Sequence, residues 1–363
     1  MGNYAIIVEQ GNRLIAAVDK IRSYPVFYVK WDDRFAVSNS ARALKSEIGL
    51  SEVDELSAIE FRMAGYVTGK ETLYKHLYQL QAGEFLIWEK IGRTLQKERY
   101  YLFCSYEVRD DKSEDLVEEL GEITDRIFRR MMGEADGAPI WVPLSGGLDS
   151  RLVLCKFKQL GYDNLYAFSY GPPGNYEARA AKYVADKIKV PWVFVPSKQK
   201  SSKKFFRSEI RRQYWSFSDG LCSIPFMQDL DILLILRTRG TLPENAILVN
   251  GQSGDFITGG HIPSPLIEDA PSVGQFLEVI FDRHYSLWLH LKTGENKRRI
   301  QEKVLKLCEI KGNDVPEKSL ASYYESWEWQ ERQTKYVVNG QRIYDFLNIP
   351  WKLPLWDFEY LHF

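Results

Sequence analysis

The sequence Pro143-Leu-Ser-Gly-Gly-Leu-Asp-Ser-Arg151 decides which fold the rest of the chain is expected to adopt. An apolar stretch over 138–144 runs into two glycines, and residues 150–160 then have the pattern of an amphipathic helix. This order predicts a strand, a tight turn and the start of a helix. Glycines let the backbone close around an anion, and the free N–H groups of a helix N-terminus point toward it. The candidate phosphate ligands are Leu144, Ser145, Gly146, Gly147 and Ser150.

Asp149 is negatively charged, so it suits a phosphate site only if a magnesium ion lies between the two. An ordinary strand-to-helix turn capped by serine and aspartate is the alternative. The complete string Ser145–Ser150 favours the nucleotide interpretation. The sequence contains no Gly-x4-Gly-Lys-Ser/Thr string, which argues against transfer of a γ-phosphate.

Bulk composition narrows the classes of function. The 363 residues suffice for two domains of ordinary size. The formal net charge of −1, from 48 basic and 49 acidic residues, predicts no nucleic-acid partner. Four cysteines without a Cys-x-x-Cys pair support neither a zinc ribbon nor a redox dithiol. With no apolar run near the ~20 residues that span a bilayer, we expect a cytoplasmic protein without a membrane partner.

The first part of the chain is expected to form an α+β domain over residues 1–108. Short apolar or alternating runs, separated by turn residues, predict antiparallel strands at 4–9, 14–18, 26–30, 34–38 and 84–89. Helical patterns lie between them at 41–47 and 57–64. A charged, loop-like segment, 110–115, then leads into a second domain, expected over 109–363.

In the second domain, strands alternate with helices. Residues 138–144, 165–171 and 192–195 read as strands, and 150–160 and 175–190 as helices between them. This alternation predicts an α/β fold with a doubly wound parallel sheet, whose ligands bind at the carboxyl ends of the strands. Further helices are expected over 203–217, 228–238, 276–289 and 320–336, which makes the C-terminal part helical.

A second glycine-rich loop follows the apolar run at 246–249 and spans Asn250 to His261. Asp255 in this loop is the expected second magnesium ligand beside Asp149, since both acids would follow strand ends. An Asx turn, in which the aspartate caps its own loop, is the alternative. The pairing of the two loops favours the metal.

These motifs resemble a known family. The string Ser145–Ser150 resembles the pyrophosphate loop of N-type ATP pyrophosphatases, and the wider chain resembles asparagine synthetases. The runs that carry the second resemblance are 19–28, 35–40, 65–69, 80–85, 250–260 and 354–357. The resemblance implies an adenine nucleotide alpha hydrolase-like sheet and a remnant of an N-terminal-nucleophile glutaminase domain. It also implies cleavage of ATP between its α and β phosphates.

The resemblance assigns further residues. Tyr170 would contact adenine, and Asn250 and Gly251 would help to bind the nucleotide. Gln252 stands where asparagine-forming members carry a glutamate, and Gln cannot act as a base. Arg332 and Arg342 resemble arginines that line the synthetase site. Gln252, Arg332 and Arg342 are therefore the candidate catalytic residues.

Other positions depart from the family pattern. The family's nucleophilic cysteine opens its mature chain, whereas position 2 is Gly2 and the first cysteine is Cys104. We therefore expect no glutaminase activity from the N-terminal domain, which resembles the family's glutaminase domain without its early part. Neither Lys335 nor Lys352 matches the position of the family's C-terminal lysine.

The sequence predicts an ATP- and Mg²⁺-dependent ligase that adenylates a small-molecule carboxylate and transfers ammonia or an amine to it. The ammonia would be free or would come from a separate glutaminase, and a second copy of the chain could form a homodimer. Two alternatives stay open. One is a degenerate homologue that binds ATP as a partner subunit, and the other is a different pyrophosphatase-loop chemistry, such as sulfur insertion into a nucleobase.

Overall fold

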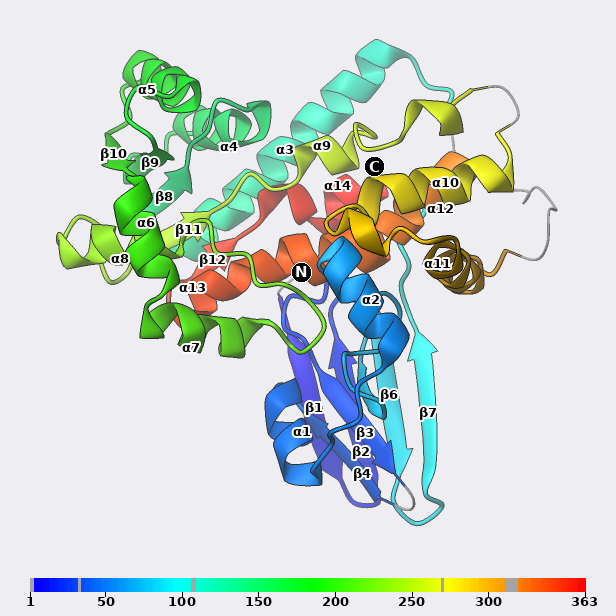
Figure 1. The fold of residues 1–363 in the computed structure, drawn as a ribbon. Coiled ribbons are helices and arrows are strands. Elements are labelled where there is room, and N and C mark those ends of the chain that lie inside the picture. The colour runs from blue at the N-terminus through cyan, green and yellow to red at the C-terminus, as the bar shows by residue number, and fades with distance from the viewer. Residues whose placement is uncertain (1–2, 32–33, 106–108, 269–270, 311–318) are drawn as a thin grey trace.

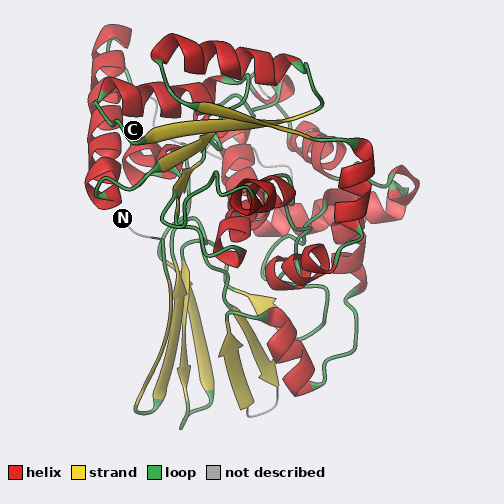
Figure 2. Ribbon diagram, turned by 90° about the vertical axis from the view of Figure 1, so that its left-hand side faces the viewer, coloured by secondary structure: helices red, strands yellow, loops and turns green. Residues whose placement is uncertain are grey.

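The computed structural model describes residues 3–31, 34–105, 109–268, 271–310 and 319–363. Two antiparallel sheets form the N-terminal unit, and a parallel sheet with helices on both faces forms the rest (Figure 1). Figure 2 shows the antiparallel strands extending away from the α/β part and its helices. The expected boundary at 108 lies outside the described residues, so it stays a prediction.

The N-terminal unit is a sandwich of a four-stranded sheet, in the order β1-β2-β6-β7, and a three-stranded sheet, β4-β3-β5. The strands are β1 Ala5–Gln10, β2 Arg13–Val18, β3 Phe27–Trp31, β4 Arg34–Ser38, β5 Leu77–Gln79, β6 Glu84–Glu89 and β7 Thr94–Arg99. Val18 and Leu86 from one sheet share a buried cluster with Tyr28 and Leu80 of the other. The expected strands are confirmed, whereas β5 and β7 were missed because their runs are short or strongly polar.

Two capped helices complete this unit. Helix α1 (Ala41–Ile48) begins after Ser40, whose side chain accepts a hydrogen bond from the N–H of Ala43. Helix α2 (Glu55–Ala64) begins in the same way after Asp54. Both end at a glycine in the left-handed region, with φ of 76° at Gly49 and 86° at Gly65. Helix α1 packs on the three-stranded sheet through Leu44, which shares a cluster with β3.

The second sheet is parallel throughout, in the order β10-β9-β8-β11-β12. Its strands are β8 Ile140–Pro143, β9 Leu165–Gly171, β10 Trp192–Pro196, β11 Ile247–Val249 and β12 Trp351–Lys352. Helices α3 (Ser113–Ala135), α4 (Leu148–Gln159) and α5 (Tyr176–Ile188) pack together in one buried cluster with its strands. Helices α7 (Glu209–Ser218), α8 (Leu230–Thr238) and α13 (Arg342–Phe346) share a second cluster with the sheet. The predicted α/β fold is confirmed.

The remaining helices belong mostly to the C-terminal part. They are α6 Gln199–Phe206, α9 Gly254–Ile257, α10 Val273–His284, α11 Gly294–Leu307, α12 Leu320–Glu328 and α14 Phe358–His362. Short 3₁₀ turns lie at Ser264–Leu266, Leu289–Leu291, Val338–Gln341 and Pro354–Trp356. Among the helices of the described chain, none is both long and apolar enough to cross a membrane.

Two helix predictions need correction. The helix expected over 203–217 is two helices, α6 and α7, because the side chain of Ser208 accepts from the N–H of Arg211 and starts a new helix. The helix expected to reach Leu289 ends at His284. The predicted 320–336 segment is helical, but it changes after α12 into a π-helix over Trp329–Val337, a rare form often found near functional sites.

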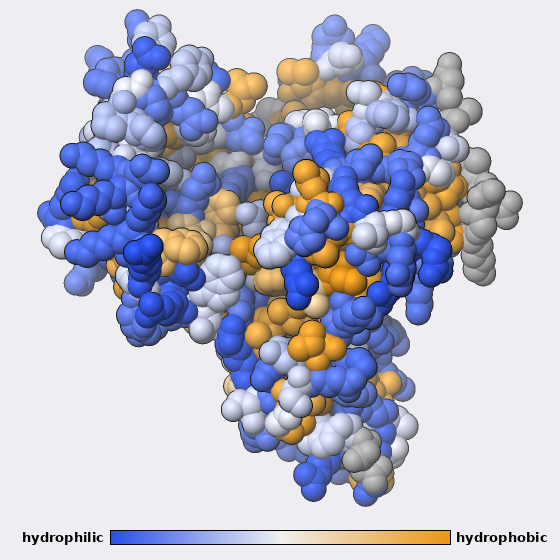
Figure 3. Space-filling view, viewed as in Figure 1, coloured by the Kyte–Doolittle hydropathy of each residue, from blue (hydrophilic) through white to orange (hydrophobic). Residues whose placement is uncertain are grey.

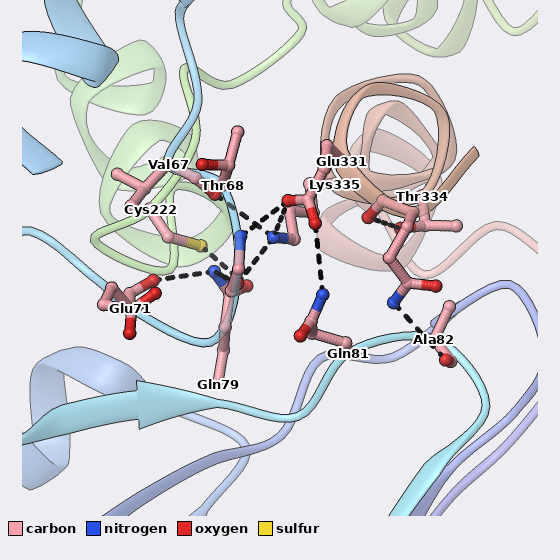
Figure 4. Close-up of polar contacts among 12 residues, drawn as sticks. Val67, Thr68, Glu71, Gln79, Gln81, Ala82, Cys222, Glu331, Thr334 and Lys335 are labelled. Carbon is pink, nitrogen blue, oxygen red and sulfur yellow. Dashed lines mark hydrogen bonds and ion pairs between the residues drawn. The ribbon is translucent and has the colours of Figure 1, made fainter. Parts of the chain in front are cut away.

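A buried polar junction joins the N-terminal unit to this π-helix. The Lys335 ammonium is fully buried and donates to the carbonyls of Val67 and Gly69 and to the Glu331 carboxylate (Figure 4). Glu331 also accepts from the N–H of Gly69 at 2.7 Å and from the side chain of Gln81 at 3.2 Å. The charges are therefore paired with each other and with the backbone, as burial requires.

His284 generates a prediction about pH. Its ring lies between the hydroxyls of Tyr66, at 3.1 Å, and Tyr324, at 2.9 Å, and burial lowers its pKa from 6.5 to about 3. Because the folded pKa lies below the unfolded one, its contribution to stability is full above about pH 6.5 and is lost as pH falls toward 3. We expect His284→Gln to remove about 2 kcal/mol of the loss in unfolding free energy between about pH 7 and pH 5. Urea unfolding at both pH values measures the unfolding free energy of each protein. An equal loss of unfolding free energy in the two proteins on going to the lower pH would contradict the prediction.

Candidate functional site

A cavity of about 600 Å³ lies where β8, β9 and β11 end. From β8 the chain adds β9 and β10 on one side of the sheet and β11 and β12 on the other. This is a topological switch point, the usual ligand site of an open α/β sheet. The cavity is lined, among others, by Leu144, Ser145, Gly147, Asp149, Ser150, Tyr170, Asn250, Gly251, Gln252 and Asp255.

The first loop is held by its two serines. The Ser150 hydroxyl accepts from the N–H of Ser145 at 3.1 Å and lies 3.0 Å from the Ser145 hydroxyl. The Ser145 hydroxyl in turn accepts from the N–H of Gly147. Arg151 turns back and donates to the carbonyls of Gly146 and Gly147. The loop carbonyls are thus engaged by Arg151, and α4 begins at Leu148 with the N–H groups of its first turn free of intrahelical partners.

The second loop interlocks with the first. The N–H of Gly254 donates to the Asp149 carboxylate at 2.9 Å. A Cβ at Gly251 would lie 2.7 Å from the backbone nitrogen of Ser150, and one at Gly254 would lie 2.6 Å from Asp149 Oδ1. Both distances are shorter than real Cβ contacts; at Gly251 the obstacle is backbone, so glycine is required there, and at Gly254 a Cβ would displace the Asp149 carboxylate. The glycines of the second motif therefore set the spacing between the loops.

Asp149 and Asp255 lie close enough to influence each other. Burial raises the pKa of Asp149, and the negative charge of Asp255 raises it further. Repulsion of this kind favours a cation between the two carboxylates. No group of three or more His, Cys, Asp or Glu side chains in the described chain is arranged to hold a metal. The pair therefore fits Mg²⁺ that takes its other ligands from phosphate oxygens and water.

His261 connects Asp255 to the C-terminal helices. Its Nε2 lies 2.8 Å from Asp255 Oδ2 and its Nδ1 lies 2.6 Å from Glu328 Oε1. Hydrogen bonds to these two carboxylates raise the pKa of His261 to about 9. Arg332 and Gln333 also donate to Glu328 Oε1, both at 3.0 Å. Sequence patterns did not single out Glu328, because it sits in an ordinary helical pattern.

Tyr170 belongs to a second polar cluster at the cavity wall. Its hydroxyl donates to Asp229 at 2.7 Å, and the hydroxyl of Tyr344 donates to the other oxygen of Asp229 at 2.9 Å. Asn250 donates to the Tyr344 hydroxyl at 3.3 Å. The Tyr170 hydroxyl is thus occupied, which leaves its ring and backbone to face a ligand. Asp229 was missed because a lone aspartate before an apolar helix reads as a cap.

Of the three candidate catalytic residues, Gln252 lines the cavity and the two arginines do not. Gln252 lines the cavity, where its side-chain carbonyl accepts from Gln341 at 2.9 Å. Arg332 pairs with Glu328 and is not among the residues that line the cavity; the hydrogen bond from His261 lowers the pKa of Asp255 most, and the charge of Arg332 adds to this. Arg342 pairs with Asp345 at 2.8 Å and stacks on Phe217, and it is not among the residues that line the cavity.

The charged side chains that line the cavity are acidic. Its described lining holds the carboxyl groups of Asp149, Glu177, Asp229 and Asp255 and no lysine or arginine. Protein groups in this lining therefore cannot neutralise a polyphosphate by themselves. The carboxylates of Asp149 and Asp255 are oxygen ligands of the kind that Mg²⁺ takes.

Known proteins resemble this chain over much of its length. A "Putative asparagine synthetase (glutamine-hydrolyzing) 2" of Methanocaldococcus jannaschii is 24% identical over 289 residues, which cover 77% of this chain and 54% of that protein. An "Asparagine synthetase (glutamine-hydrolyzing) 3" of Bacillus subtilis is 21% identical over 273 residues, covering 71% and 43%. The chain thus spans about half the length of these relatives.

One solved structure and one family model complete the comparison. The NH3-dependent NAD synthetase of Campylobacter jejuni is 14% identical, with a TM-score of 0.28 and coverage of 52% of this chain and 82% of that one. The model of the family described as asparagine synthase matches residues 121–345, more than half of the chain. This match includes both interlocked loops and α12, and the chain belongs to the asparagine synthase family.

Proposed function

We propose that this protein is an ATP-dependent ligase that adenylates a carboxylate and transfers ammonia or an amine to the activated acyl group. The observation that carries the proposal is the interlocking of two glycine-rich loops at the switch point, with Asp149 and Asp255 facing the same cavity. A cavity of about 600 Å³ lies within the usual range for small-molecule sites.

In this proposal the first loop binds the phosphates. The hydroxyls of Ser145 and Ser150 and the backbone N–H groups at the start of α4 would hold the pyrophosphate portion. Mg²⁺ on Asp149 and Asp255 would neutralise the β and γ phosphates and favour departure of pyrophosphate. The ring of Tyr170, fixed through Asp229, would form a wall for the adenine.

The reaction balances in two steps. A substrate carboxylate oxygen forms a bond to the α-phosphorus while the bond from that phosphorus to pyrophosphate breaks. The nitrogen lone pair then bonds the acyl carbon, the bond from that carbon to the AMP oxygen breaks, and the nitrogen gives its proton to the leaving AMP phosphate or to water. Gln252 can orient these groups but cannot take the proton. Gln341 donates to the Gln252 side-chain carbonyl and fixes its orientation.

A second candidate function is nucleotide binding without ligation. It is favoured by the described cavity lining, which places four carboxylates and no lysine or arginine around the ligand. Such a site offers no fixed cation to stabilise the leaving pyrophosphate. The two candidates differ in a product, because only the ligase converts ATP to AMP.

The first prediction concerns that product. With Mg²⁺ and the matching carboxylate, we expect the protein to release AMP and pyrophosphate in equal amounts, measured by chromatography over a panel that includes aspartate, uronic acids and peptides. Asp149→Asn keeps an acceptor for the N–H of Gly254 but removes the charge, so the rate should fall by about 10²-fold or more. Chelation of Mg²⁺ should have the same effect.

An exposed aspartate provides the matched control. Asp186 on α5 pairs with Lys182 at the surface, away from the cavity, and Asp186→Asn should leave the rate unchanged. ATP binding without AMP for any acid in the panel would reject the ligase and support the nucleotide-binding candidate.

The second prediction concerns the nitrogen donor. The sulfur of Cys104 lies 3.6 Å from the Ser326 hydroxyl, and no histidine among the described residues hydrogen-bonds it. We therefore expect ammonium salts or an amine, but not glutamine, to support amide formation. Glutamate release from glutamine measures this, and release that Cys104→Ser abolishes would contradict it.

The third prediction tests the interlocked loops. Gly251→Ala places a Cβ against the backbone of Ser150, so the loops must separate, at a cost of about 1–3 kcal/mol. We expect binding of an ATP analogue, measured by calorimetry with Mg²⁺, to weaken at least tenfold. Gly121→Ala on α3, where a Cβ meets nothing within 4 Å, is the control and should bind normally. Equal affinities of the two variants would contradict the prediction.

A further inference from the structure

A compact basic surface forms on α6 and α7, outside the nucleotide cavity. Its cations are Lys198, Lys200, Lys203, Lys204, Arg207, Arg211 and Arg212. Within 198–212 only Glu209 opposes these seven charges, which gives this segment +6. Because the whole chain carries −1, the remaining residues carry −7. The charges of the chain are therefore unevenly distributed, although its net charge is close to zero.

Most of these cations have no acidic partner. Arg212 pairs with Glu209, and the guanidinium of Arg211 lies over the ring of Phe206 at 4.1 Å. None of the other five has a carboxylate within ion-pair distance among the described residues, and all five are exposed. Figure 3 shows a largely hydrophilic surface over this side of the molecule. Unpaired cations of this density repel one another, so the surface favours an anionic partner.

An exposed aromatic side chain lies among the charges. Phe205 packs toward α8 and the core, whereas its neighbour Phe206 is 53% exposed. The surface next to them, lined by Lys200, Lys203 and Arg207 among others, is concave, with a volume of about 740 Å³. Basic residues combined with an exposed phenylalanine on a short amphipathic helix are typical of surfaces that bind the interface of an anionic membrane.

We propose that α6 and the start of α7 bind the protein peripherally to anionic phospholipid. The phosphates of the headgroups would pair with Lys200, Lys203 and their neighbours, and Phe206 would enter the interface. A lipid surface presents many phosphates in two dimensions, which matches a compact cluster on a helix about 12 Å long. Single-stranded nucleic acid instead needs a charged groove that tracks its backbone and several aromatic side chains on which successive bases stack, whereas the exposed aromatic side chain on α6 is Phe206.

The test uses the full chain and vesicles. We expect it to sediment with vesicles of equal parts phosphatidylcholine and phosphatidylglycerol, but not with phosphatidylcholine alone. Binding should be lost at about 1 M NaCl, where screening removes the attraction. Lys200→Glu combined with Lys203→Glu should lower the partition coefficient at least tenfold, since each basic residue contributes strongly near such a surface. Phe206→Ser should lower the partition coefficient by a smaller factor. This decrease should also be seen at moderate salt, because the variant removes an apolar contact and not a charge.

A matched variant and a competing ligand complete the experiment. Arg298→Glu with Lys306→Glu makes the same charge change on α11, on the other side of the molecule, and should bind normally (Figure 1). Circular dichroism verifies that each variant is folded. Equal loss in both double variants, no preference for phosphatidylglycerol, or binding of single-stranded RNA without binding of vesicles would each overturn the proposal. The inference does not depend on the synthetase reaction.

Discussion

A buried ion pair between Lys335 and Glu331 anchors the contact between the two halves, and the largely buried pair between Lys303 and Glu60 joins them as well. Lys335 and Glu331 lie on the same turn of the π-helix, and both also bind the backbone between Val67 and Gly69 in the N-terminal unit. Burial lowers the pKa of Lys335, and the charge of Glu331 opposes that effect. Removing one partner of a buried pair typically costs about 3–5 kcal/mol, because the other charge is left uncompensated. The junction therefore fixes how the N-terminal unit sits on the synthetase part.

Charge in the nucleotide cavity sets a second constraint. Apart from the loop N–H groups, the described lining offers carboxylates rather than cations. Asp149 and Asp255 repel each other, and Asp255 is held by His261, which reaches back to Glu328 on α12. The position of one proposed metal ligand thus depends on a helix far from it in sequence. Substitutions in α12 would act on this ligand without touching the cavity.

The sequence predicted the parts of the molecule that local patterns encode. The strand, glycine turn and helix around Ser145, and the second loop at Gly251, meet at the cavity as expected, because both motifs follow strand ends of one parallel sheet. Glu328 and Asp229 could not be found in this way, since their roles depend on contacts over 67 and 59 positions of the chain. Arg342 was predicted as a site residue from its position in a motif, but its side chain pairs with Asp345 and does not line the cavity.

The π-helix gives the N-terminal unit a structural role at the cavity. Glu331 and Lys335 attach this helix to the loop at Val67–Gly69, while Gln333, between them in sequence, binds Glu328 and lies 3.2 Å from His261. A π-helix places residues i and i+5 near each other, and Gln333 therefore reaches back to Glu328, five positions earlier. The N-terminal unit, through its contact with Glu331, thereby holds the segment that positions His261 and, through it, Asp255. In this arrangement the N-terminal unit is a structural support for the cavity that Asp255 lines.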